Sequence, residues 1–468
     1  MNSLKVFKLY HKCIHSMNIL SPPMTTKCFV RTLLSQSYNC DNQWEARLDN
    51  DLLSKINAQS FFNELNQRYQ KKLRVTAVDI DLFANSVTRE EQLEELQHLV
   101  FQLRRTKETV NTLDSTHHSF CRIFLKYRQT EQLVKIISNR IGFGIFPDQF
   151  CYNMILDQLI EDKNVRNAAK VSTLMMAQEE EGTSLSQILS LYAVHKYING
   201  NYDKNEWFNS EELERLTKES ELYPNACTDR AVITTDDNDE EVRYIRVPYI
   251  RNEYFDDHFD LRDPNHLCGK TLYFFSQKFD DIVGRSYQII GLILYEKWDK
   301  CLHLLEVLSK NKQNVIVKEV VDRVDQLINS ISEENSDKQK LLDIKKVLND
   351  MSSGSQIVDQ NLDELVSEKL KHIKDLEKQD MQLMTKLFID WENERQLALN
   401  KQIEELFREE KKREIEEKKR ELQMTSRKVY FFENFTKHEM DFSEAERKIQ
   451  ELKAKTVVEE DYIPPETY

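Results

Sequence analysis

The residues most able to do chemistry lie between Phe101 and Ile141, where basic and aromatic side chains alternate. Eight basic and three acidic residues give this stretch a local charge of +5, although the formal net charge of the protein is −14. Such a patch attracts nucleic-acid phosphates, and rings such as Phe120 and Tyr127 can stack on unpaired bases. For any single residue the alternative is a solvated helix face with aromatic residues in the core. The basic residues are Arg104, Arg105, Lys107, Arg122, Lys126, Arg128, Lys135 and Arg140.

An internal repeat predicts the elements that position this patch. A shift of 35 residues places Phe124–Tyr127 on Leu159–Asp162. The same shift places His118 on Asn153. The apolar positions keep helical spacing in each copy, so each unit is predicted to be two helices joined by a short turn. Such a hairpin cannot bury its own apolar face and must stack on its neighbours. We therefore predict an all-α fold, an α-solenoid of helical hairpins.

The stretch GIFPDQFCYNMILDQL, residues 144–159, marks where one unit meets the next. Pro147 ends the preceding helix because its ring clashes with helical continuation, and Asp148 can accept hydrogen bonds from the free amides of the next helix. This junction, GI-x-PD-x-x-x-YN, resembles that of pentatricopeptide repeats. The resemblance implies that Asn153, and His118 in the preceding unit, face a groove where each repeat can read one RNA base. Only this junction is well formed, so a long sequence-specific code is not expected.

The composition favours long helices and argues against several classes of protein. The chain has 468 residues with only 8 Gly and 8 Pro, far below average usage. No run of about 18 apolar residues is present, so we expect no membrane-spanning segment. The P-loop, dinucleotide, nucleophile-elbow and HExxH motifs are absent. We therefore predict no enzyme, no small-molecule substrate and no cofactor.

One cluster of metal-ligand residue types lies near residue 260. The two prolines of this segment, Pro248 and Pro264, and the irregular spacing put these residues on no single helix face, so we expect a loop with aspartate caps and no metal. None of the eight cysteines forms a CxxC pair, which favours reduced thiols over a zinc or redox site. The cluster consists of Asp256, Asp257, His258, Asp260, Asp263, His266 and Cys268.

The first forty residues differ in charge from the rest of the chain. They contain no Asp or Glu and five basic residues, the last of which is Arg31. A basic, acid-free, Ser-containing amphipathic start is typical of a mitochondrial transit peptide, and an ordinary basic arm is the alternative. We predict a transit peptide over residues 1–38 and a location in the mitochondrial matrix.

A long charged helix is predicted near the C-terminus, because residues 356–427 contain neither Pro nor Gly. Apolar residues between Ile373 and Leu406 recur at 3-, 4- and 7-residue steps and could pack on a partner helix as in a short coiled coil. Beyond Phe407 the helix is nearly all charge, and its Glu-to-Lys/Arg pairs at i,i+4 support a solvated spacer.

These observations predict six segments. They are a transit peptide (1–38), pentatricopeptide-like repeats (39–200), an acidic linker and extended docking segment (201–268), further hairpins (269–350), a long charged helix (356–427) and a C-terminal tail (428–468).

The order of motifs resembles a known family more closely. The motifs WEAR at residues 44–47, YNMILD, ILSLY and the segment 246–272 follow one another as in the pentatricopeptide-type proteins of the mitochondrial small ribosomal subunit, the S-twenty-seven family. The resemblance covers residues 40 to 420. It implies a structural role in the mitoribosome, with small-subunit ribosomal RNA and neighbouring ribosomal proteins as partners, and leaves transfer RNA open as a further partner. The residues assigned to RNA contact are Arg104, Arg105, Lys107, His118, Arg122, Lys126, Arg128 and Asn153.

Two other functions stay open at this point. A free mitochondrial RNA-binding regulator of RNA processing or stability would need more repeats with a consistent base-reading pair. A cytosolic helical adaptor would require that the basic N-terminus is no presequence. The degenerate repeats and acidic balance favour the ribosomal role over both.

Overall fold

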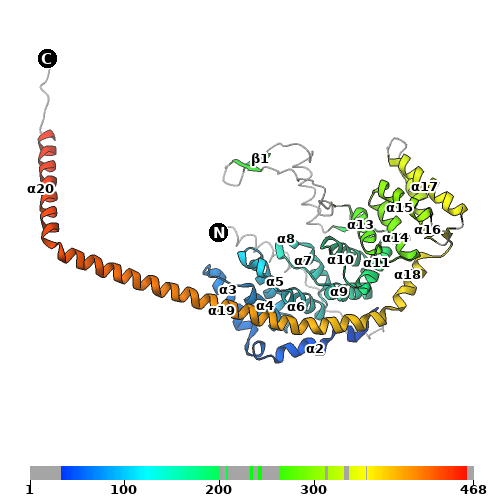
Figure 1. Ribbon diagram of the computed structural model, residues 1–468, viewed down its shortest axis with the longest axis horizontal. Helices are drawn as coiled ribbons and strands as arrows, with labels where there is room; N and C mark the ends of the chain where they lie inside the picture. Colours follow the sequence, from blue (N-terminus) through cyan, green and yellow to red (C-terminus); the bar gives the residue numbers. More distant parts are fainter. Residues whose placement is uncertain are drawn as a thin grey trace, which may run out of the picture. The chain divides into compact units, whose positions relative to one another are not determined.

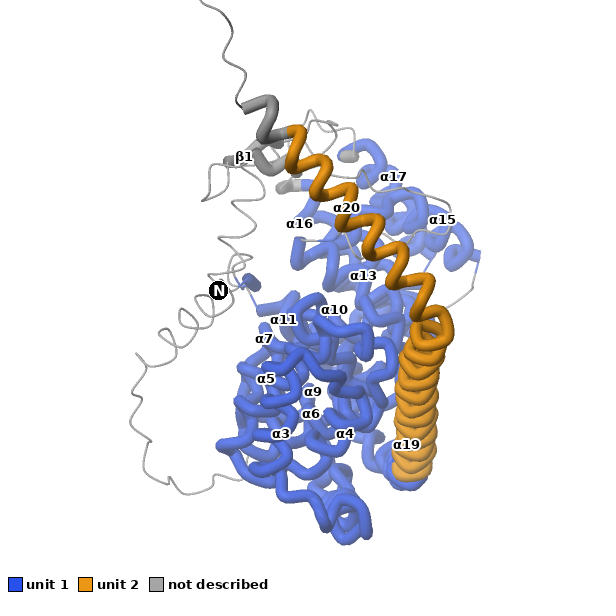
Figure 2. Tube along the Cα trace, turned by 90° about the vertical axis from the view of Figure 1, so that its left-hand side faces the viewer, with its two compact units in different colours: residues 1–391 blue, residues 392–468 orange. Residues whose placement is uncertain are grey.

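The chain divides into two compact units, residues 1–391 and 392–468 (Figure 2). Among the described helices, none is both long and apolar enough to cross a bilayer. The computed structural model describes residues 33–200, 202, 207–208, 232–235, 241–244, 261, 263–310, 315–330, 337–354 and 356–460.

Successive helices joined by short turns build the first unit (Figure 1). The prediction of an all-α helical solenoid is confirmed. Before the repeats lie η1 (Gln36–Asn39), α2 (Asp41–Glu45), η2 (Ala46–Asp49), η3 (Leu53–Lys55) and α3 (Ala58–Gln70). The repeat helices are α4 (Ala77–Ser86), α5 (Gln92–Arg104), η4 (Lys107–Asn111), α6 (Asp114–Lys126), α7 (Thr130–Ser138), α8 (Arg140–Phe143), α9 (Gln149–Glu161), α10 (Val165–Ala177) and α11 (Ser184–Asn199). The later helices are α13 (Pro264–Ser276), α14 (Ile282–Leu294), α15 (Trp298–Ser309), α16 (Glu319–Ser330), α17 (Asp337–Ser353) and α18 (Leu362–Lys371).

The turn inside the hairpins repeats with the period found in the sequence. Arg128, Lys163 and Glu296 each follow the first helix of a hairpin in the left-handed conformation, with φ of 54°, 56° and 57°. In each case the next residue donates its N–H back to a carbonyl of the last helical turn, which closes the helix by the Schellman pattern. Arg128 and Lys163 lie 35 residues apart. The three bonds are Gln129 N–H to Phe124 O (2.9 Å), Asn164 N–H to Leu159 O (2.8 Å) and Lys297 N–H to Leu292 O (3.0 Å).

The junction between two hairpins is also built as the sequence predicts. Gly144 ends α8 with a φ of 64°, a conformation that glycine adopts without strain. The side chain of Asp148 then caps α9, because its Oδ1 accepts the N–H of Cys151 at 2.7 Å. This cap directs α9 back along α6 and so places Asn153 beside the preceding repeat.

A continuous apolar core runs from Leu34 to Ile373 and joins the hairpins into one body. Each large side chain that is fully buried contributes about 1.5–3 kcal/mol. Helices α13 and α14 approach most closely at two glycines, since a Cβ on Gly269 would lie 2.7 Å from the carbonyl oxygen of Gly291. Trp298 at the start of α15 is 7% exposed, as expected for the packing anchor of a hairpin.

Two pairs of short strands occur in the described part of the chain, and only the second joins segments that are distant in sequence. Strands β1 (Val232–Thr235) and β2 (Glu241–Tyr244) pair antiparallel within the acidic segment. Strands β3 (Ile316–Val317) and β4 (Ile357–Val358) pair in parallel, and no sequence signal predicted this pair. The second pair anchors the chain just before α18.

The C-terminal helices extend further than expected. Helix α19 runs over Ile373–Glu433 and α20 over Phe435–Glu460, so residues 428–433 and 435–460 of the predicted tail are helical. The signal was present in the sequence, because no Gly or Pro occurs between Gly354 and Pro464. Beyond Trp391 both helices belong to the second unit.

Candidate functional site

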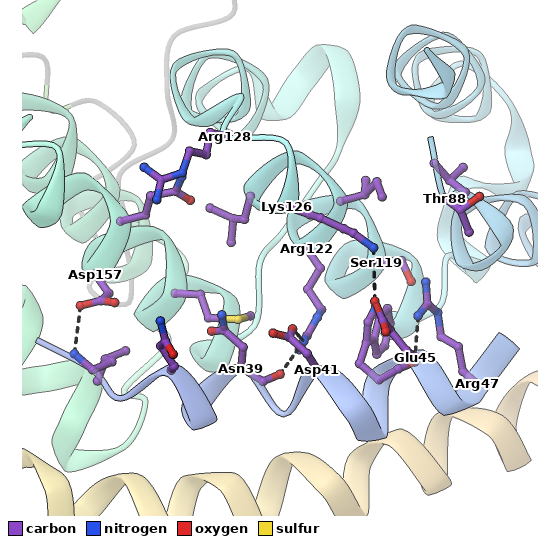
Figure 3. Close-up of a pocket in the computed structure, with 18 of the residues that line it drawn as sticks. Asn39, Asp41, Glu45, Arg47, Thr88, Ser119, Arg122, Lys126, Arg128 and Asp157 are labelled. Carbon is purple, nitrogen blue, oxygen red and sulfur yellow. Dashed lines mark hydrogen bonds and ion pairs between the residues drawn. The ribbon is translucent and has the colours of Figure 1, made fainter. Parts of the chain in front are cut away.

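The predicted RNA-reading residues share one face of α6 and α9, which we call the inner face; it carries His118, Arg122, Asn153 and Asp157. Two other segments of the first unit cover this face, residues 33–49 and the start of α19 up to Trp391. Figure 3 shows the first of these segments lying along the repeat helices. The groove in which a base would be read is therefore filled by the chain itself.

Asn153 is fully buried and is hydrogen-bonded by both covering segments. Its Nδ2 donates to the hydroxyl of Tyr38 at 2.7 Å and to Oδ2 of Asp380 at 3.4 Å. The Tyr38 hydroxyl and the Thr183 hydroxyl also donate to Oδ2 of Asp380, at 3.3 and 2.9 Å. Burial raises the pKa of Tyr38 well above its ordinary value, and the Asp380 carboxylate raises it further. A base could reach Asn153 only after Tyr38 and Asp380 had moved.

His118 is fully buried and is surrounded by aromatic rings. Its ring centroid lies 5.0 Å from that of Trp44 and 4.8 Å from that of Trp391. On the other side, Nδ1 lies 2.8 Å from Oδ2 of Asp148 and 3.3 Å from the sulfur of Cys151. The covering segments therefore exclude solvent from the imidazole.

The charge of His118 follows from these neighbours. Burial lowers the pKa of the imidazole, but Cys151 and Asp148 raise it to about 9. Burial also raises the pKa of the Cys151 thiol well above its ordinary value. The thiol therefore keeps its proton at neutral pH and acts on His118 through their hydrogen bond, whereas the Asp148 carboxylate supplies the negative charge that holds a proton on the imidazole.

The His118, Asp148 and Cys151 group was not predicted from the sequence, although the spacings of His118 to Cys121 and of Asp148 to Cys151 hint at it. The three ligand atoms lie within 4.8 Å of one another and are residue types that can hold a metal. The Asp148 carboxylate is already used, with one oxygen on His118 and the other capping α9. Structural zinc sites need four ligands, so the geometry is that of a hydrogen-bonded cluster.

Two of the predicted basic residues form ion pairs with the covering segment (Figure 3). Arg122 is 6% exposed and its Nη2 lies 2.9 Å from Oδ1 of Asp41. One helical turn further, Nζ of Lys126 lies 3.3 Å from Oε1 of Glu45, and both of these side chains are more than half exposed. The guanidinium of Arg122 also lies 5.0 Å from the ring of Trp44. Two ion pairs therefore hold α2 along α6.

The other four predicted residues divide into two groups at opposite ends of α6. At one end, Arg104 is half-buried and its Nε donates to the carbonyl of Ile141 at 3.3 Å. Next to it, Arg105 and Lys107 are exposed, and the Arg105 guanidinium lies 4.0 Å from the ring of Phe101. At the other end, Arg128 is exposed. It lies 3.9 Å from both Glu161 and Asp162. The thirteen residues of α6 separate the groups by about 20 Å.

A cavity of about 490 Å³ remains between residues 34–48 and helices α6 and α9 (Figure 3). Its lining has as many acidic as basic side chains, so it offers no net attraction for a phosphate. The charged lining residues are Asp41, Glu45, Arg47, Arg122, Lys126, Arg128, Asp157 and Glu161.

The metal-type cluster near residue 260 is described only in part. Asp256, Asp257, His258 and Asp260 lie outside the described residues. Asp263 caps α13, since its Oδ1 accepts the N–H of Asn265 at 2.8 Å. Cys268 is buried, and its burial raises the pKa of the thiol.

The apolar stripe at the start of α19 packs within the chain. Ile373, Met384 and Trp391 are buried in the first unit. The expected coiled coil with a partner helix is not tested by these contacts and stays a prediction.

The fold and the filled inner face define a helical-repeat scaffold protein. The family model described as Mitochondrial 28S ribosomal protein S27 matches residues 7–421, and the chain belongs to this family. It is therefore a protein of the mitochondrial small ribosomal subunit, located in the mitochondrion in the mitoribosome, and the predicted resemblance and location are confirmed. Family membership favours a structural, non-enzymatic role. The pentatricopeptide type of the repeats and the transit peptide stay predictions.

Proposed function

We propose that the chain is a structural component of the small subunit that binds small-subunit ribosomal RNA through phosphates and thereby supports mitochondrial translation. The exposed basic residues at the two ends of α6 make the contact; we call Arg105, Lys107, Lys126 and Arg128 the outer basic residues. The occupied inner face carries this proposal, because it leaves no open groove for base reading and directs RNA to the outside. His118, Arg122 and Asn153 then hold the scaffold together.

This proposal is tested by reversing charge at each end of α6. The double substitutions Arg105→Glu with Lys107→Glu, and Lys126→Glu with Arg128→Glu, should each weaken binding to small-subunit ribosomal RNA. They should also flatten its salt dependence, by roughly 0.7–0.9 in slope for each phosphate that the protein no longer neutralises. The matched control is Lys340→Glu with Lys346→Glu on α17, which removes the same charge elsewhere. Unchanged affinity and slope in both test variants would refute the proposed contact.

Neighbouring ribosomal proteins are proposed to bind the second unit. An aromatic and apolar group surrounds the bend between α19 and α20, and we call it the junction cluster. It is exposed, with Phe432 at 73% and Phe442 at 67%. Contiguous exposed apolar surface of this kind marks protein contacts. The junction cluster consists of Tyr430, Phe431, Phe432, Phe435, Met440 and Phe442.

The sequence also left a free RNA-binding regulator and a transfer-RNA partner open. A regulator that reads bases through Asn153 would need the inner face to be vacated, so this function is the weaker candidate. Nothing in the fold or in the family match supports transfer RNA, and it is not proposed.

A further inference from the structure

Apolar and aromatic side chains form a stripe along one side of α20. They recur at alternating steps of three and four residues from Phe435 to Leu452, and this spacing keeps them on one helix face. Phe442 is 67% exposed and Ile449 is 52% exposed, so more than half of the surface of each residue is open to solvent. We call this stripe the α20 seam. It consists of Phe435, His438, Phe442, Ala445, Ile449 and Leu452.

The aromatic end of the seam is held in place by contacts among its rings. The imidazole of His438 stacks on Phe431, with the ring centroids 5.5 Å apart and the ring planes at 9°. Phe431 also contacts Phe435, at a centroid distance of 5.9 Å. Because Phe431 belongs to α19, the ring contacts continue across the bend between the two helices (Figure 1). The rings therefore form an ordered surface before a partner binds, which lowers the entropy cost of binding.

The spacing of the seam fits a partner that is itself an α-helix. Steps of three and four residues define the a and d positions of a heptad, whose side chains insert between those of a facing helix. From Phe435 to Leu452 the seam extends for about 26 Å, at 1.5 Å per residue. It holds three a and three d residues, and such a stripe with charged flanks indicates a coiled coil.

The charges beside the seam change sign along the helix. Acidic residues flank the aromatic end and basic residues flank the aliphatic end, at the e and g positions that select the partner in coiled coils. The acidic flank repels RNA phosphates, and the aliphatic residues offer no ring on which a base could stack. A protein helix therefore fits this surface better than RNA. The flanking residues are Glu439, Asp441 and Glu446 at the aromatic end and Lys448, Lys453 and Lys455 at the aliphatic end.

A parallel second copy of the chain does not fit these charges. In a parallel pair each g residue lies beside the e residue of the next heptad on the other helix. Asp441 would then lie beside Glu446 of the second copy, and Lys448 beside its Lys453. Two like-charged contacts on each side of the seam disfavour this pairing, so the charge pattern calls for a helix of different sequence.

We propose that the α20 seam binds an amphipathic α-helix of a neighbouring ribosomal protein. The partner helix presents apolar residues at the same heptad spacing, with basic residues opposite the end at Glu439 and acidic residues opposite the end at Lys453. Basic side chains suit the aromatic end for a second reason, since they also bind the faces of aromatic rings. This inference rests on the proposed binding of neighbouring proteins by the second unit, and it adds the face, the bound element and the charge pattern.

The face is tested by photo-cross-linking in the assembled small subunit. The full chain is imported into isolated mitochondria with a photoreactive phenylalanine analogue in place of Phe442, Ile449 or, in the junction cluster, Phe432. Matched controls carry the analogue in place of Arg447 or Ala454, on the opposite side of α20. Small subunits that contain the chain are isolated on a sucrose gradient and irradiated, and the linked residues are identified by mass spectrometry.

The expected products come from the seam. The yield should be several-fold higher from Phe442 and Ile449 than from the control positions. The residues linked to these two positions should lie about seven residues apart in one segment of another ribosomal protein, because seam positions repeat every heptad. RNA products, links between two copies of the chain, or equal yields from seam and control positions would overturn the inference.

The result at Phe432 separates this inference from the proposed docking of the second unit. Links to a neighbouring protein from Phe432, with none from the seam, would keep the docking and refute the seam. If neither Phe432 nor the seam is linked to protein, both are refuted. Recovery of the chain with the small subunit is scored first, so a failure of assembly is recognised separately.

The charge pattern is tested by reversing the acidic flank. Glu439→Lys with Glu446→Lys should lower the yield of the Phe442 cross-link roughly fivefold, because basic residues of the partner helix would then face like charges. The matched control is Glu444→Lys with Glu451→Lys, which makes the same change of charge away from the seam and should keep the yield. Equal yields in the two double variants would exclude the proposed charge complementarity.

Discussion

Large side chains are buried on the inner face of the repeats but exposed on the C-terminal helices beyond Trp391. On the inner face Tyr38 and Asn153 are fully buried, and the Tyr38 hydroxyl and the Nδ2 of Asn153 form hydrogen bonds within the chain. In the second unit Phe432 is 73% exposed and Leu422 70% exposed. The chain itself therefore covers the inner face of the repeats, whereas the C-terminal helices carry exposed apolar side chains. This difference separates the part of the chain that forms the scaffold from the part suited to docking.

The largest expected effect comes from two tyrosines, one in each region. Tyr38→Ala removes a fully buried ring and leaves Asn153 and Asp380 without its hydroxyl, so we expect a loss of about 3–5 kcal/mol in the free energy of unfolding. Tyr430→Ala, at a ring that is 59% exposed, should change it by less than about 0.5 kcal/mol. Urea denaturation followed by circular dichroism measures both. Similar losses would mean that the second unit is also a packed core.

The next effect concerns the charge buried at His118. Its pKa of about 9 lies above the ordinary value of 6.5, so the ion pair with Asp148 stabilises the fold fully below pH 6.5. The stabilisation is lost as the pH rises through about 9, to a total of no more than about 3 kcal/mol. His118→Gln should remove this loss from a pH series of unfolding midpoints. His438→Gln on α20 is the control and should keep the wild-type profile; a profile unaltered by His118→Gln would exclude a charged imidazole.

The smallest expected losses in stability come from substitutions at two basic residues that lie one turn apart on α6. Arg122→Gln should cost about 2 kcal/mol, because a buried guanidinium loses its bonds to Asp41 and to the carbonyl of Asn39. Lys126→Gln should cost less than about 0.5 kcal/mol, since its pair with Glu45 is solvated. Thermal unfolding of the two variants separates these values. Equal costs would show that exposure does not decide the strength of the contacts between α2 and α6.

Local signals in the sequence predicted the repeat architecture but not what fills it. The 35-residue period and the cap at Asp148 depend on residues close together in the chain, and both were found. The bond from Tyr38 to Asp380 joins residues 342 positions apart, and no local pattern records such a pairing. The basic patch was misleading for the same reason, because Arg122 reaches Asp41 from 81 positions away.

The C-terminal helices teach a different lesson. Their length could be predicted from local sequence, since the stretch without Gly or Pro extends to Ile463. The acidic end of the sequence led instead to the prediction of a C-terminal tail. Which residues of α20 become buried cannot be predicted from the sequence, because that depends on the surface of a partner.

The hydrogen bonds that join Tyr38, Asn153 and Asp380 in pairs also limit the order in which this part of the protein can fold. A chain that enters its compartment N-terminus first presents Tyr38 early and Asn153 115 residues later, but Asp380 only after a further long stretch. Closing so long a loop costs conformational entropy, and folds rich in such distant contacts form slowly. The inner face therefore stays incomplete, with Tyr38 lacking its carboxylate partner, until almost the whole first unit has arrived. The inner face can therefore be closed only after the residues up to Asp380 are available.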